Sequence, residues 1–228
     1  MKRSISILVT IIMLLLICSC SNANGTSIPV KIGIIDSCIS KSMVQELDIE
    51  NYYEISDAVT NNDITHGSII TNIIKHEAKK CEIFYCSIYD ESCIGKIDYV
   101  VSAITWCIEN KVDIISMSFA TLQDNPELRK VIEQAQEKGI VLIASCINLS
   151  NKICYPAMYK DVISVTDGFN QSATINLKGK VIKVKMCGKT MTKSEASFLT
   201  AYACGLIAEN LSHGATLDVI LNKVGLFS

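Results

Sequence analysis

Short apolar runs alternate with longer segments of helical periodicity along most of this chain. The expected strands are 30–35, 82–88, 112–117, 139–145, 162–166 and 180–186, and the expected helices are 66–79, 97–109, 126–138 and 197–211. Strands that lack polar alternation and are separated by helices are typical of a parallel sheet buried on both faces. We therefore predict an α/β fold, a three-layer sandwich whose mostly parallel central sheet is covered by helices on both faces.

Polar residues follow several of these expected strands at the point where each strand ends. Asp36 ends the first strand, Ser116 and Ser118 end the third, and Asn148 follows the fourth. In parallel sheets, sites gather outside the carboxyl ends of the strands. We expect these side chains to converge on one edge of the sheet.

The chain contains three histidines. His76 lies among charged residues at an expected helix end, and His213 precedes a glycine where a cation is locally favourable, so both are expected to be surface residues. His66 differs because it opens a helix, where the imidazolium form is disfavoured. A neutral imidazole that can act as a base is therefore natural at His66.

The N-terminus is typical of a targeting segment. Lys2 and Arg3 precede an almost unbroken apolar run at 5–17. This run is shorter than the roughly 20 residues that a membrane-spanning helix needs, and its length suits a signal segment.

The residues after this run resemble the lipobox of bacterial lipoproteins, with Ile17, the small Ser19 and then Cys20. In this interpretation Cys20 becomes the lipidated first residue and anchors the chain to a membrane. The alternative is ordinary signal cleavage after Ala23. The expected organisation is a signal segment at 1–20, a short linker at 21–29 and one domain at 30–228, exported to the outer face of the cell membrane or secreted.

Eleven cysteines are many for 228 residues. They show no CxxC pair and no Cys/His spacing of a zinc site, and most lie in apolar runs, so we expect buried small side chains rather than a redox or metal centre. We predict no metal site and no cofactor. The net charge of −2 and the lack of a basic run with interleaved aromatics give no reason to expect nucleic acid as a partner.

Six segments resemble motifs of the subtilases, a family of serine peptidases. They cover nearly the whole expected domain and come in the order of an aspartate, a histidine, an asparagine and a serine motif. They are VKIGIIDS (30–37), DITHGS (63–68), VDIISMSFA (112–120), GIVLIASCIN (139–148), YPA (155–157) with the strand after it, and SFLTAYACG (197–205).

The resemblance implies a serine endopeptidase. In this interpretation Ser197 attacks the scissile carbonyl, His66 takes its proton and Asp36 orients the imidazole. The Asn148 amide contributes to the oxyanion hole. The segment that would bind the substrate as an added strand comprises Ser116, Met117, Ser118, Phe119 and Ala120. The resemblance also implies a cis bond at Tyr155–Pro156, a peptide or protein substrate and a monomer.

The chain also departs from the family pattern at several positions. Family glycines are replaced at Cys38, Asn72, Ala120 and Ile147, Glu195 and Ala196 replace Gly-Thr before the serine, and Ala201 replaces a proline. Only about ten residues separate Cys20 from the first expected strand, so we expect a short, divergent member without a prodomain. These departures leave an alternative open, a catalytically impaired protein of subtilase fold that binds peptides.

Overall fold

A computed structural model describes residues 28–55, 60–89, 96–146, 154–167, 172–177, 180–185 and 196–224. These residues contain one eight-stranded sheet with the strand order β2-β3-β1-β4-β5-β6-β7-β8. The strands are β1 (Val30–Ser37), β2 (Asn51–Glu54), β3 (Cys81–Tyr89), β4 (Ile114–Met117), β5 (Val141–Cys146), β6 (Ile163–Asp167), β7 (Ser172–Leu177) and β8 (Lys180–Lys185).

The first six strands in this spatial order are parallel, and β7 and β8 continue the sheet in antiparallel fashion. β1 lies between β3 and β4, with Gly33 opposite Phe84 on one side and Ile115 on the other. The mostly parallel sheet predicted from the apolar runs is confirmed.

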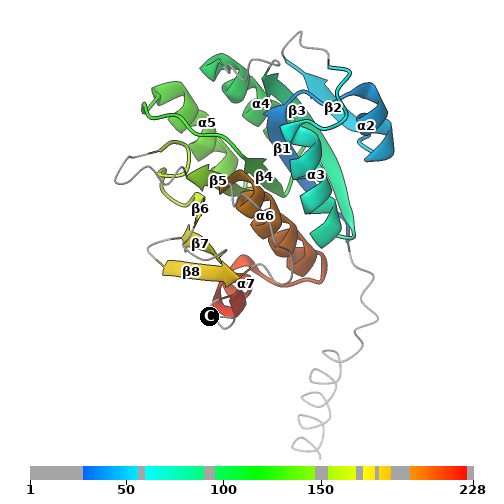
Figure 1. Cartoon of the computed structure of the whole chain (residues 1–228). Coiled ribbons are helices and arrows are strands. Elements are labelled where there is room, and N and C mark those ends of the chain that lie inside the picture. The colour runs from blue at the N-terminus through cyan, green and yellow to red at the C-terminus, as the bar shows by residue number, and fades with distance from the viewer. Residues whose placement is uncertain are drawn as a thin grey trace, which may run out of the picture.

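Helices cover both faces of the sheet (Figure 1). One face packs against α3 (His66–Glu77) and α6 (Ala196–Ser212), with α2 (Lys41–Glu46) and α7 (Leu217–Val224) in the same apolar cluster. The other face packs against α4 (Ile97–Glu109) and α5 (Pro126–Glu137). The three-layer arrangement is therefore confirmed.

Two strands and two helices were not predicted from the sequence. β2 is a polar edge strand, and β7 alternates polar and apolar residues instead of forming an apolar run. α2 and α7 are only 6 and 8 residues long. β2 pairs with the longer β3, and the short α7 packs beside the longer α6. The alternation in β7 is a strand signal of a different kind, which a search for unbroken apolar runs does not detect.

α3 and α6 pack closely against each other on one face of the sheet. A Cβ atom on Gly205 of α6 would lie 2.6 Å from Cβ of Glu77 and 3.0 Å from the carbonyl oxygen of Ile74. Only glycine therefore allows the two helices to approach so closely. Because α6 is buried along most of its length, this contact fixes where the first turn of α6 lies.

Six of the described cysteines are buried: Cys38, Cys86, Cys107, Cys146, Cys154 and Cys204. Burial raises the pKa of Cys204 to about 12, and burial also raises the pKa of Cys86. These thiols therefore stay protonated near neutral pH, as expected for small apolar side chains in a core.

Within the described part of the chain, no helix has both the length and the apolar character needed to cross a membrane. The expected signal segment at 1–20, including Cys20, lies outside the described residues.

Candidate active site

Asp36 lies near the carboxyl end of β1, where its side chain is only 3% exposed. Its Oδ1 accepts a hydrogen bond from the backbone N–H of Ser37 at 2.7 Å. A buried carboxylate needs such donors to remain charged. The Asp36 side chain is thus held at the strand end that was predicted from the sequence.

His66 is the first residue of α3, as its helix-start sequence predicted. The preceding Thr65 caps the helix, since its side chain accepts from the Ser68 N–H while the Ser68 side chain accepts from the Thr65 N–H. The His66 Nδ1 atom lies 2.7 Å from Oδ1 of Asp36. This contact leaves the other ring nitrogen, Nε2, on the opposite side of an imidazole that is 33% exposed.

The backbone of Gly67, the residue after His66, is hydrogen-bonded to Ser37, the residue after Asp36. Its N–H donates to Oγ of Ser37 at 3.0 Å, and the buried Tyr85 hydroxyl donates to the Ser37 carbonyl oxygen at 2.6 Å. Burial, and then the nearby charge of Asp36, raise the pKa of Tyr85 well above its usual value, so this hydroxyl remains a donor. A Cβ atom at residue 67 would lie 1.8 Å from the Tyr85 hydroxyl, which explains the glycine.

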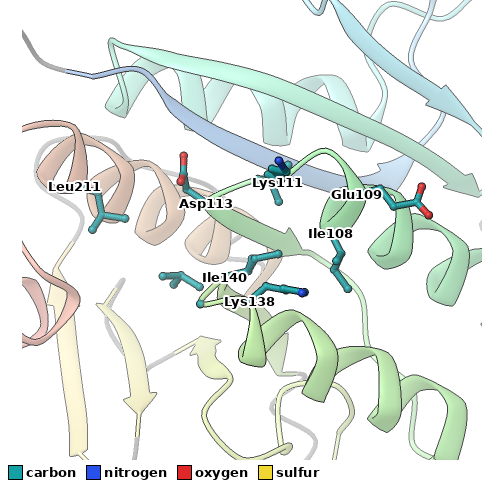
Figure 2. Close-up of a pocket in the computed structure, with 10 residues that line it drawn as sticks. Ile108, Glu109, Lys111, Asp113, Lys138, Ile140 and Leu211 are labelled. Atoms are coloured by element: carbon teal, nitrogen blue, oxygen red, sulfur yellow. The ribbon is translucent and has the colours of Figure 1, made fainter.

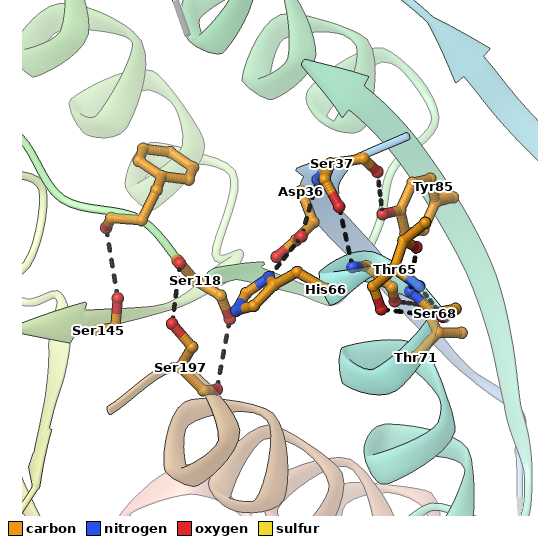
Figure 3. Close-up of polar contacts among 12 residues, drawn as sticks. Asp36, Ser37, Thr65, His66, Ser68, Thr71, Tyr85, Ser118, Ser145 and Ser197 are labelled. Carbon is orange, nitrogen blue, oxygen red and sulfur yellow. Dashed lines mark hydrogen bonds and ion pairs between the residues drawn. The ribbon is translucent and has the colours of Figure 1, made fainter. Parts of the chain in front are cut away.

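Ser197 lies in the first turn of α6, and Figure 3 shows it with Ser118, Asp36 and His66. Its Oγ donates to the carbonyl oxygen of Ser118 at 3.1 Å, and Oγ of Ser118 donates back to the Ser197 carbonyl oxygen at 3.4 Å. The ring of the next residue, Phe198, stacks on the His66 imidazole with centroids 5.8 Å apart. The start of α6 is therefore beside the imidazole.

The segment expected to bind substrate divides into two parts. Ser116 and Met117 lie inside β4, where their main chains face β1 on one side and β5 on the other, and both side chains are buried. Ser118, Phe119 and Ala120 follow the strand and lie beyond its sheet pairing. Only these last three residues are thus placed to present main-chain groups to a bound peptide.

A cavity of about 460 Å³ adjoins this segment. Phe119 and Ala120 line one side, and the Tyr89 ring meets Phe119 edge to face at 6.2 Å. The remaining lining residues are Lys96, Ile97, Val100, Thr121 and Leu122. The lining therefore combines apolar side chains with the polar groups of Lys96 and Thr121.

A larger cavity, of about 760 Å³, lies at the other edge of the sheet (Figure 2). It is lined by residues where α4 and α5 end and where β4 and β5 begin, together with Leu211 of α6. Asp36 lies near the carboxyl end of β1, and Ser118 lies just beyond the carboxyl end of β4. The larger cavity is therefore remote from the Asp36–His66 pair.

Two residues of the expected site lie outside the described residues. They are Asn148, expected in the oxyanion hole, and Glu195, whose carboxylate would lie near it. The Tyr155–Pro156 bond is cis, as expected. His76 and His213 are exposed and pair with Glu77 and Glu209, which confirms their surface positions.

Sequence reasoning missed three supporting residues, Ser37, Tyr85 and Asp63. Their side chains contact the segments around the Asp36–His66 pair. Ser37 and Asp63 lie inside two of the matched motifs, which could have drawn attention to them, whereas no local signal marks Tyr85. Within the described ranges, no three His, Cys, Asp or Glu side chains come close enough together to hold a metal ion.

The chain is similar in sequence to several curated proteases. The chain is 27% identical over 209 residues to the minor extracellular protease Epr of Bacillus subtilis, covering 85% of this chain and 32% of that protein. It is 27% identical over 176 residues to subtilisin DY of Bacillus licheniformis, covering 70% of this chain and 64% of that protein. The chain spans about a third to a half of the length of the first curated relatives it matches.

Two solved structures share the fold. The prenylagaramide maturation protease PagA superimposes with a TM-score of 0.58 at 18% identity, covering 81% of this chain and 75% of that one. A lanthipeptide protease superimposes with a TM-score of 0.59 at 16% identity, covering 81% and 73%. At these identities the likeness extends to the fold alone.

The family model described as the subtilase family matches residues 29–204. This range includes the strand that ends near Asp36, the helix that begins at His66 and the first turns of the helix that carries Ser197. Because the match spans most of the chain, the chain belongs to the subtilase family.

Proposed function

We propose that this protein is a serine endopeptidase that hydrolyses peptide bonds through Asp36, His66 and Ser197. The observation that carries the proposal is the 2.7 Å contact between His66 Nδ1 and Asp36 Oδ1, beside the helix turn that carries Ser197. A carboxylate that accepts from Nδ1–H holds the imidazole in the tautomer whose Nε2 can receive a proton. The names of the curated relatives, which are proteases, support the same activity.

The first step forms a bond between Oγ of Ser197 and the substrate carbonyl carbon while His66 takes the hydroxyl proton. In the structure, Oγ of Ser197 donates to the Ser118 carbonyl oxygen. The hydroxyl must therefore turn from this carbonyl toward the imidazole. The protonated His66 then returns the proton to the leaving amine, and a water molecule releases the acyl group by the same steps in reverse.

The developing negative charge needs donors that are already in place. The first N–H groups of a helix have no partner within the helix, and Ser197 lies in the first turn of α6. Its N–H, together with the Asn148 side-chain amide, would form the oxyanion hole. Ser118, Phe119 and Ala120 would pair with the substrate main chain, and the adjoining cavity of about 460 Å³ would receive a substrate side chain.

Replacing Asn148 with alanine is expected to lower kcat by about 10²–10³-fold with little change in KM, the range measured for the equivalent asparagine of subtilisin. The amide acts mainly on the transition state, so substrate binding should be retained. Steady-state kinetics on a peptide substrate would measure the effect, with Asn151→Ala as a control in the same stretch of sequence. An unchanged kcat would remove Asn148 from the mechanism.

Labelling with a fluorophosphonate tests the activity directly. The reagent forms a phosphorus–oxygen bond with an activated serine, fluoride leaves, and the hydroxyl proton passes to the base. We expect labelling of the wild-type protein at Ser197, found by peptide mass mapping, and none in Ser197→Ala. A folded wild-type protein without Ser197-dependent labelling would favour the alternative, a subtilase-fold protein that binds peptides without cutting them.

We also propose that the protein works outside the cytoplasm, either anchored through a lipid on Cys20 or secreted after cleavage behind Ala23. The targeting pattern at 1–20 supports export, as does the word extracellular in the name of the Epr relative. The intact mass of the mature protein distinguishes a lipidated Cys20 from an unmodified N-terminus at Asn24.

A further inference from the structure

Asp63, three residues before His66, joins two segments that flank the Asp36–His66 pair. Its Oδ1 accepts hydrogen bonds from Oγ of Ser40 at 2.5 Å and from Oγ of Ser42 at 2.6 Å. Both serines belong to the segment that follows Asp36 in the chain. The carboxylate of Asp63 therefore connects the residues before the histidine to the residues after the aspartate.

The main chain of Asp63 is tied to the helix that begins with His66. Oγ of Ser68 lies 2.9 Å from the Asp63 carbonyl oxygen, to which it can donate, and it accepts from the Thr65 N–H at 3.0 Å. Ser68 is buried in the first turn of α3. The same hydroxyl lies 2.9 Å from the Thr65 carbonyl oxygen, so Ser68 links both Asp63 and Thr65 to the helix turn that carries His66.

The serine end of this connection is equally well fixed. Ser40 is buried and caps α2, where its Oγ accepts from the Met43 N–H at 3.2 Å. Ser40 is four residues from Asp36 along a segment that is buried from Val30 to Ser40, apart from the half-buried Lys31. A hydrogen bond to Ser40 therefore fastens Asp63 to the buried segment that directly follows the strand end holding Asp36.

We propose that Asp63 is a positioning residue that holds His66 in register with Asp36, a role that rests on the proposed peptidase function. The Asp36–His66 and Gly67–Ser37 hydrogen bonds already join these two segments close to the imidazole. The bridge from Asp63 to Ser40 and Ser42 adds an attachment on the other side of His66 in the sequence. Together these attachments hold the first turn of α3, and with it His66, in a fixed position relative to Asp36.

The charge of Asp63 strengthens the bridge. The hydroxyls of Ser40 and then Ser42 hold the pKa of Asp63 below its usual value, so it remains a carboxylate wherever imidazole can act as a base. Hydrogen bonds to a charged acceptor are stronger than those to a neutral one. Asparagine at this position keeps an acceptor oxygen without the charge and should preserve the bridge only in part.

Rates of fluorophosphonate labelling and of peptide hydrolysis in three variants test the proposal. Asp63→Ala should lower both the labelling rate constant and kcat by about 10-fold to 100-fold, because small misplacements of catalytic groups cost rates of this order. KM should change less than twofold, and Asp63→Asn should fall between Asp63→Ala and wild type. Ser42→Ala, an exposed change that removes one donor, should give a smaller loss in the wild type and no further loss in Asp63→Ala.

Asp48→Asn is the matched control, because it removes the same charge from an exposed position at the far end of α2. Its labelling rate should equal that of the wild type. If the wild type is labelled at Ser197 and Asp63→Ala is labelled at the same rate, the positioning role is overturned while the proposed function stands. If the wild type is not labelled, both are overturned. Should Asp63→Ala fail to fold, an unchanged rate in Ser42→Ala and Asp63→Asn would overturn the positioning role.

Discussion

Ser197→Ala and His66→Ala are each expected to lower kcat by about 10⁶-fold, and the double variant is expected to be no slower than either. The hydroxyl and the imidazole act as one unit, so removing one makes the other useless. In subtilisin, a member of the same family, single losses of the serine or the histidine have effects of this size. Residual activity should remain because binding and the oxyanion hole persist without the nucleophile.

Single-turnover hydrolysis of a chromogenic peptide would measure these rates, with circular dichroism to confirm that the variants fold. His76→Ala is the matched histidine control, because His76 is exposed and paired with Glu77 at the far end of α3. Its kcat should equal that of the wild type. Losses in the two single variants that multiply in the double variant would show that Ser197 and His66 do not act together, contrary to the proposed mechanism.

Gly67→Ala is expected to lower the free energy of unfolding by about 3 kcal/mol, combining overpacking with a disturbed buried hydrogen bond. The added Cβ would lie 1.8 Å from the Tyr85 hydroxyl and 2.9 Å from the Ser37 carbonyl oxygen. Either the Tyr85 side chain or the backbone of residue 67 must shift to relieve these contacts. Because Gly67 directly follows His66, a backbone shift there would also displace the imidazole. The variant should therefore also lose peptidase activity at temperatures where it remains folded.

Urea unfolding would measure the change, and Tyr85→Phe supplies a second arm. Phenylalanine removes the hydroxyl that clashes, so the double variant Gly67→Ala/Tyr85→Phe should be more stable than the sum of the single effects predicts. Gly139→Ala is the glycine control. A Cβ atom added at Gly139 would have no atom within 4 Å, so only the φ of 78° disfavours alanine there. The free energy of unfolding should therefore fall by about 1 kcal/mol. If the changes in the free energy of unfolding caused by Gly67→Ala and Tyr85→Phe simply add in the double variant, the loss of stability does not come from a clash with the Tyr85 hydroxyl.

The fold and the placement of Asp36 and His66 follow from local features of the sequence. The apolar runs mark the buried parallel strands, because a strand covered on both faces has no polar side to display. Asp36 lies where such a run ends, and Thr65 and Ser68 mark the start of the helix at His66. These signals depend only on neighbouring residues, so the sequence carries them without knowledge of the rest of the chain.

Contacts between distant segments were decided by the tertiary structure alone. Tyr85 supports Gly67 through Ser37, Ser118 receives the Ser197 hydroxyl, and Asp63 reaches Ser40, and each contact joins residues more than ten positions apart. Which of these side chains meet depends on the register of β1 against β3 and β4 and on how closely α3 and α6 approach. The strand register and the distance between the two helices are set by the packing of the whole core. A local sequence pattern therefore cannot predict them.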